Sequence, residues 1–119
     1  MHIDARTLDQ GTQIEGDLCI IGAGAAGISM ALEWKDSPYK VILLEGGGFD
    51  LESDIQDLYR GESVGQPYFP LQSSRLHYFG GTTGHWGGWC APLDPIDFKK
   101  RDWVPQSGWP IQKEDLDPF

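Results

Sequence analysis

The sequence predicts an α/β fold that opens with a strand, a helix and a second strand. Two apolar runs, 18–21 and 41–44, are too short for helices and read as buried parallel strands. Between them, apolar residues recur at helical spacing from Ile28 to Trp34, and Asp36-Ser37-Pro38 ends the pattern. A strand, helix, strand unit of about 30 residues builds a parallel sheet.

A glycine-spaced turn joins the first strand to the helix. Gly22, Gly24 and Gly27 give the spacing G-x-G-x-x-G. In a dinucleotide-binding turn the first glycine allows the tight bend, the second admits a pyrophosphate, and the third lets the helix pack on the strand. The helix N-terminus then directs free N–H groups at the phosphates. We therefore predict that these glycines, with Ala25 and Ala26, contact a dinucleotide.

An acid ends the second strand. Glu45 follows the glycine turn by about 20 residues, where a carboxylate accepts hydrogen bonds from the adenosine ribose and repels a 2′-phosphate, which disfavours NADP. The alternative is a plain glycine-rich turn with Glu45 as a solvated strand end, and the surrounding strand and helix patterns disfavour it. Gly46 opens a run of three glycines that lets the chain bend beside the adenosine, and we include it in the predicted site.

A second glycine-rich segment runs from Arg75 to Cys90. It holds five glycines, two threonines, two histidines and two tryptophans. Glycine N–H groups and threonine hydroxyls can donate to phosphate or flavin oxygens, while tryptophans exclude water from a ring. A glycine-rich surface loop with its aromatic residues tucked inward has the same composition. Composition alone leaves these two interpretations open.

The other segments are predicted to be connections. Residues 1–16 read as a loose polar arm, 50–59 as a weak helix or turn with a solvated acidic face, and 61–74 as an extended excursion. Proline-punctuated loops follow, in which we expect Trp103 and Trp109 to be core residues. Since only two parallel strands are predicted, we expect the chain to be the N-terminal piece of a longer protein.

Composition excludes several classes of function. The net charge is −9, and the nine Lys and Arg residues form no patch larger than 99–101, which disfavours nucleic acid as a partner. Cys19 and Cys90 show neither a zinc-ligand spacing nor a disulfide framework, so no metal is predicted. The sequence contains no signal-peptide pattern and no apolar run of membrane-spanning length. We expect a cytoplasmic protein without a membrane segment, and export together with a partner subunit stays open.

Three segments, in their order and separation, resemble the N-terminal portion of glucose-methanol-choline (GMC) oxidoreductases: 22–27, 45–48 and 80–83. The resemblance covers most of 17–119. Within the family, residues 80–86 are similar to the G-G-x-[ST]-x-H-W segment of pyranose oxidase and of bacterial sugar and gluconate dehydrogenases. The aryl-alcohol and choline branch has Gly-Gly-Ser-Ser followed shortly by Asn instead. The departure at His85 favours a sugar or polyol substrate.

The resemblance implies FAD as the cofactor. Adenosine would lie at Glu45, the pyrophosphate at the first glycines, and the isoalloxazine near a second group of residues: Gly80, Gly81, Thr82, Thr83, His85 and Trp86. In pyranose oxidase the histidine of this segment is joined covalently to the flavin. Gly84 here replaces the threonine that precedes that histidine, so a covalent link and a simple contact both stay open.

The resemblance also implies a Rossmann-like FAD-binding domain, of which 17–119 would be the N-terminal part and 1–16 an arm. The family oxidises a carbinol by passing hydride to flavin N5 while a base, usually histidine, takes the hydroxyl proton. That base lies near the family's C-terminus, outside these 119 residues, so no catalytic residue is assigned. The electron acceptor, whether oxygen, a quinone or a haem subunit, stays open. A nicotinamide-dependent dehydrogenase and a non-catalytic nucleotide-binding fragment are the alternatives.

Overall fold

The computed structural model describes all 119 residues as a mixed α/β chain with one parallel sheet. It divides into two compact units, Met1–Trp86 and Gly87–Phe119. The first unit contains the sheet and every segment of the predicted site.

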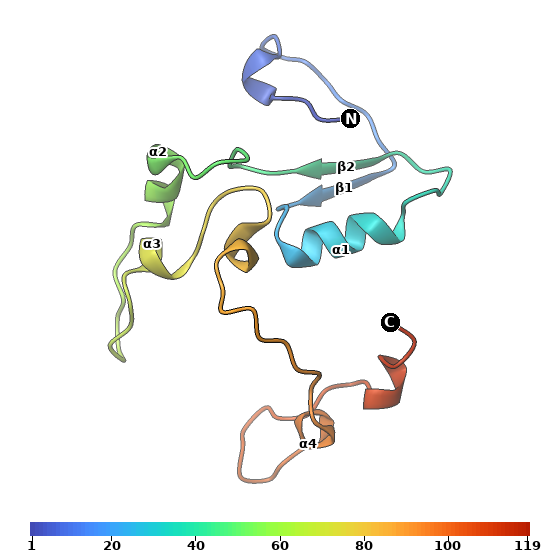
Figure 1. The fold of residues 1–119 in the computed structure, drawn as a ribbon, viewed down its shortest axis with the longest axis vertical. Helices are drawn as coiled ribbons and strands as arrows, with labels where there is room; N and C mark the ends of the chain where they lie inside the picture. The colour runs from blue at the N-terminus through green and yellow to red at the C-terminus, as the bar shows by residue number, and fades with distance from the viewer. The chain divides into compact units, whose positions relative to one another are not determined.

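The sheet of the first unit has two parallel strands, β1 (Leu18–Ile21) and β2 (Val41–Leu44) (Figure 1). Leu18 pairs with Val41, and Ile21 with Leu44. Both predicted strands are confirmed with the predicted bounds. The Gly22 N–H donates to the Leu44 carbonyl at 2.7 Å, which carries the pairing one step past the strand ends.

Helix α1 (Ala25–Glu33) is the crossover between the strands. It begins directly after Gly24, whose extended backbone is the N-cap, and ends at Trp34. Asp36 adopts a left-handed φ of +64°, a conformation that cannot continue a helix. The predicted helix and its stop are therefore confirmed.

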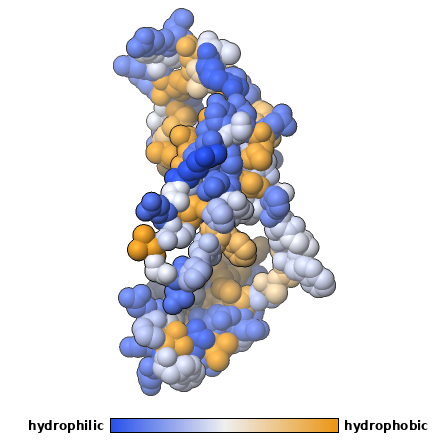
Figure 2. Space-filling model, turned by 90° about the vertical axis from the view of Figure 1, so that its left-hand side faces the viewer, coloured by the Kyte–Doolittle hydropathy of each residue, from blue (hydrophilic) through white to orange (hydrophobic).

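The core of the first unit is small. Its buried apolar residues are Ile20 and Ala23, on β1 and in the turn that follows it. Many large apolar side chains are exposed instead, including Ile21 at 86% and Leu32 at 60%. Orange hydrophobic side chains are accordingly visible among the hydrophilic ones in Figure 2. The sheet and α1 thus bury few of the apolar residues that they carry.

Short elements make up the rest of the first unit. They are the 3₁₀ turns η1 (Ala5–Thr7), η2 (Asp57–Tyr59) and η3 (Gly81–Gly84), and the one-turn helices α2 (Ser53–Gln56) and α3 (Leu71–Ser74). The expected extended excursion therefore ends in a helix, because Pro70 at the N-cap of α3 pre-sets the backbone that enters it.

The N-terminal arm is more ordered than expected. Asp4 caps η1 by accepting from the Arg6 N–H, and the Arg6 guanidinium also contacts Glu52 at 3.2 Å. The hydrogen bonds from Arg6 hold the pKa of Asp4 below its usual value. The arm is thus tied to the segment just before α2.

The second unit is loop-rich, with α4 (Pro95–Phe98) and the 3₁₀ turn η4 (Lys113–Asp115). Phe98 is buried, and its carbonyl accepts from the Trp109 N–H. The expectation that Trp103 and Trp109 are core residues is wrong, since their exposed fractions are 76% and 58%. Phe98 is the only buried apolar residue of this unit, so the unit has no core that could enclose the indoles.

No helix in the structure combines the length and the apolar character that crossing a membrane requires.

Candidate functional site

Three glycine-containing segments meet where the two strands end. The Gly80 N–H donates to the Ala23 carbonyl at 2.7 Å, and Gly24 and Gly80 form a parallel β-bridge. The Phe79 N–H donates to the Gly48 carbonyl at 2.8 Å. Segments that are far apart in the sequence are therefore brought together at the carboxyl end of the sheet, where open α/β sheets bind ligands.

A cleft of about 670 Å³ lies at this meeting point. Its walls come from the strand ends, the first glycine turn, η2 and the segment before η3, and consist of Ile21, Gly22, Gly24, Leu44, Glu45, Gly46, Tyr59, Leu76, His77, Tyr78, Gly81 and Thr82. Six residues of the predicted site line it: Gly22, Gly24, Glu45, Gly46, Gly81 and Thr82.

The glycines of the first turn differ in what surrounds them. Gly22 has a φ of +97°, which a side chain would strain. A Cβ on Gly27 would collide with the Gly22 carbonyl oxygen and touch Ile20, so α1 packs on the strand only with glycine there. A Cβ on Gly24 would meet no protein atom within 4 Å, although Gly24 lines the cleft. Gly22 thus needs glycine for its backbone and Gly27 for packing, whereas Gly24 faces open space.

Glu45 ties the two strand ends together. Its Oε2 accepts from the Ala23 N–H at 2.7 Å, and its Oε1 accepts from the Gly47 N–H at 3.0 Å. The side chain is only 15% exposed. Because each carboxylate oxygen carries two lone pairs, both oxygens keep an acceptor position for a further donor.

His77 faces Glu45 from the third segment and was not predicted. Its Nε2 lies 3.8 Å from Glu45 Oε1, and its ring stacks on Tyr59 with centroids 4.8 Å apart. A histidine near a glycine-rich segment is no signal by itself. Sequence spacing could not have found the pair, because the contact depends on the tertiary fold.

The remaining predicted residues do not line the cleft. Ala25 and Ala26 are exposed in the first turn of α1, and Gly80 contributes the bridge to Gly24. Thr83 Oγ1 donates to the Gly80 carbonyl at 2.5 Å, which holds the η3 turn. His85 and Trp86 follow η3 and are exposed. The structure thus brings the first glycine turn and Glu45 together with Gly81 and Thr82 at the cleft, whereas Ala25, Ala26, Thr83, His85 and Trp86 do not line it.

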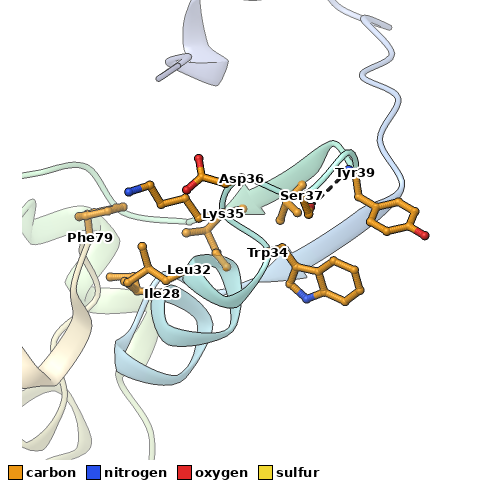
Figure 3. Close-up of a pocket in the computed structure, with 11 residues that line it drawn as sticks. Ile28, Leu32, Trp34, Lys35, Asp36, Ser37, Tyr39 and Phe79 are labelled. Carbon is orange, nitrogen blue, oxygen red and sulfur yellow. Dashed lines mark hydrogen bonds between the residues drawn. The ribbon is translucent and has the colours of Figure 1, made fainter. Parts of the chain in front are cut away.

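A separate, mostly apolar hollow of about 400 Å³ lies between α1 and the turn that follows it (Figure 3). Ile28 and Leu32 of α1 line it with Phe79, and the Trp34 and Tyr39 rings meet edge to face at 5.4 Å. Its charged lining groups are Lys35 and Asp36. The hollow contains no constellation of residues that would carry chemistry. No group of three His, Cys, Asp or Glu residues in the structure is placed to hold a metal ion.

Comparison with known proteins gives one weak similarity. The chain is 27% identical to a 2-methyl-1,2-propanediol dehydrogenase from Mycolicibacterium austroafricanum. The alignment covers 87% of this chain and 22% of that relative, so the chain spans less than a quarter of the relative's length. No family model matches the chain, and no solved structure matches it. By its name, that relative is a dehydrogenase that acts on a diol.

Proposed function

We propose that the chain is the FAD-binding part of a GMC-type oxidoreductase with a Rossmann-like fold, in which residues 17–119 bind the cofactor. The observation that supports this proposal is the parallel bridge between Gly24 and Gly80, which joins two glycine segments beside an acid at the sheet's carboxyl end. A cleft lined by a glycine turn at a helix N-terminus and by a carboxylate suits an adenine dinucleotide.

Different residues of the cleft would bind different parts of the cofactor. The α1 N-terminus would direct its free N–H groups at the pyrophosphate, which Gly24 admits because a Cβ there has open space. Glu45 would accept from the adenosine ribose with the lone pairs that its backbone bonds leave free. When bound, the flavin would supply hydride acceptance at N5. We leave the catalytic base outside this chain.

The proposed substrate class is a small polyhydroxyl compound, oxidised at a CH–OH group. Two observations support it: the G-G-x-[ST]-x-H-W pattern at 80–86, which resembles that of sugar-oxidising flavoproteins, and the diol in the name of the relative. Sugars, polyols and 2-methyl-1,2-propanediol all carry a hydroxyl group beside a second oxygen-bearing carbon. We therefore propose a substrate that presents two neighbouring hydroxyl groups.

The test is a flavin spectrum of the purified protein followed by chromatography of the released cofactor. We expect absorbance bands of oxidised flavin and release of one FAD per chain. Bleaching of these bands under anaerobic conditions would then be measured with 2-methyl-1,2-propanediol, glucose and sorbitol, with ethanol as the single-hydroxyl control. Reoxidation by air and by a quinone would identify the electron acceptor.

The alternatives give different results in the same experiment. A colourless protein that binds NADH and oxidises a diol with NAD would be a nicotinamide-dependent dehydrogenase. A protein that binds FAD but is not reduced by any alcohol would be a nucleotide-binding module without this activity. Either result would overturn the proposed reaction.

A further inference from the structure

We propose that His77 is a positioning residue that holds the Glu45 carboxylate in place for the adenosine ribose. This inference rests on the proposed function, since it concerns the ribose end of the same cleft. It assigns a role to His77, and to the α2–η2 segment behind it, which the sequence presents only as a weak helix.

Two contacts fix His77. Its backbone N–H donates to Gln56 Oε1 at 2.9 Å, and its ring stacks on Tyr59 at an interplanar angle of 25°. The side-chain amide of Gln56 also donates to the carbonyls of Gln72 and Arg75, at 2.6 and 2.5 Å. Gln56 therefore attaches the chain leading to His77 to the end of α2. The imidazole is 21% exposed and cannot turn away without losing the stack.

The orientation of the ring directs one nitrogen at Glu45. Nε2 lies 3.8 Å from Glu45 Oε1, a distance for electrostatic attraction rather than a hydrogen bond. Nδ1 is buried without a partner. A proton is more favourable on Nε2, where the carboxylate stabilises it, than on Nδ1, where nothing accepts it. The ring thus presents its N–H to the acid that would hold the ribose.

The glycines after Glu45 make room for this arrangement. A Cβ on Gly46 would lie 2.6 Å from His77 Nε2, and a Cβ on Gly47 would collide with the His77 carbonyl and Tyr78 Cα. Gly46 has no left-handed φ, so its lack of a side chain serves packing rather than backbone freedom. A methyl group at this position would push the ring away from Glu45 without altering either residue.

The first experiment measures ribose recognition. ADP and 2′-deoxy-ADP compete with FAD for the purified apoprotein, and the ratio of their dissociation constants reports the contact to the ribose hydroxyl. For the wild type we expect a preference for ADP of about tenfold or more. Glu45→Gln and His77→Ala should each bring the ratio towards one. A merely structural loss would weaken both ligands equally and leave the ratio unchanged.

The second experiment displaces the His77 ring by a substitution at Gly46. Gly46→Ala should lower the ADP preference, as His77→Ala does. The ADP preference of the double variant should not fall below that of the single variant with the lower preference, because the methyl group acts only through the imidazole. His77→Gln, which keeps an N–H donor near the Nε2 position, should restore part of the preference. His2→Ala is the matched control, since His2 contacts Phe49 outside the cleft and should leave the ratio unchanged.

Thermal unfolding of each variant shows that it folds. If His77→Ala does not fold, His77→Phe replaces it in the comparison, because phenylalanine keeps a ring on Tyr59 and removes both nitrogens. A wild-type ratio in the His77 variants, or additive effects of Gly46→Ala and His77→Ala, would overturn the role of His77 alone. A wild-type protein that binds neither FAD nor ADP would overturn the proposed function, and this inference with it.

Discussion

The Glu45 carboxylate accepts a hydrogen bond from the Ala23 N–H at 2.7 Å, which joins the end of β2 to the glycine turn after β1. Its other oxygen accepts from the Gly47 N–H. An acid at this position therefore stabilises the turn in which a phosphate would bind, in addition to any contact with a ribose. Binding and local stability are linked through one side chain.

Replacing Glu45 should therefore affect both properties. We predict that Glu45→Ala lowers the free energy of unfolding, at about 1–3 kcal/mol for each backbone N–H left unpaired, and weakens FAD binding by roughly one to two orders of magnitude. Chemical denaturation of the apoprotein and FAD titration measure the two effects. Unchanged stability and affinity would make Glu45 a solvated strand end.

Gly24 should be needed for the cofactor but not for the fold. We predict that Gly24→Val loses FAD, because its side chain would occupy the open space beside the α1 N-terminus. Apoprotein stability should stay within about 0.5 kcal/mol of the wild type, since no protein atom is met. Gly87→Val is a control glycine outside the cleft, with only an ordinary contact to Trp89 nearby. Stoichiometric FAD in the purified Gly24→Val protein would contradict this prediction.

Gly27 should behave in the opposite way. In an ordinary helix, Gly→Ala stabilises by about 1 kcal/mol. Here the new Cβ would meet the Gly22 carbonyl oxygen, and we predict that Gly27→Ala destabilises the apoprotein by about 1–3 kcal/mol. Ser29→Ala, at an exposed position of the same helix, should be neutral or slightly stabilising. A higher melting temperature for Gly27→Ala would show that α1 does not pack closely on the strand.

His85 should contact the flavin without a covalent bond. It is exposed outside the cleft and follows Gly84 rather than a threonine. We predict that acid precipitation of the flavin-loaded protein releases all the colour to the supernatant, and that His85→Ala still binds FAD with an altered redox potential. A yellow pellet, and a peptide containing His85 that is heavier by one FAD, would contradict this prediction.

Local patterns predicted the elements that depend on local interactions. The two strands and α1 follow from apolar periodicity, and Asp36-Ser37-Pro38 stops the helix whatever surrounds it. The meeting of the glycine segments was anticipated only through the family resemblance. Periodicity carries no information on a bridge between residues as distant as Gly24 and Gly80.

The parts that the sequence did not predict depend on long-range packing. The sequence predicted 50–59 only as a weak helix or turn, yet Gln56 and Tyr59 of this segment contact His77. The glycine run after Glu45 suggested a bend, whereas Gly46 and Gly47 also admit the His77 segment. The prediction that Trp103 and Trp109 are buried was wrong for the same reason, because burial of an indole requires packing partners from elsewhere in the fold.

The bridge between Gly24 and Gly80 also bears on the order of folding. The β1–α1–β2 unit closes over a short stretch of chain, whereas the bridge must close a much longer loop, which costs more entropy and yields few contacts in return. We expect the cleft to form last and to open first. Amide exchange at Gly80 should therefore be faster than in β1, and should slow when FAD is added, because a ligand that spans both glycine segments adds its binding free energy to the closed form. In that case the nucleotide would complete the fold of the site that receives it.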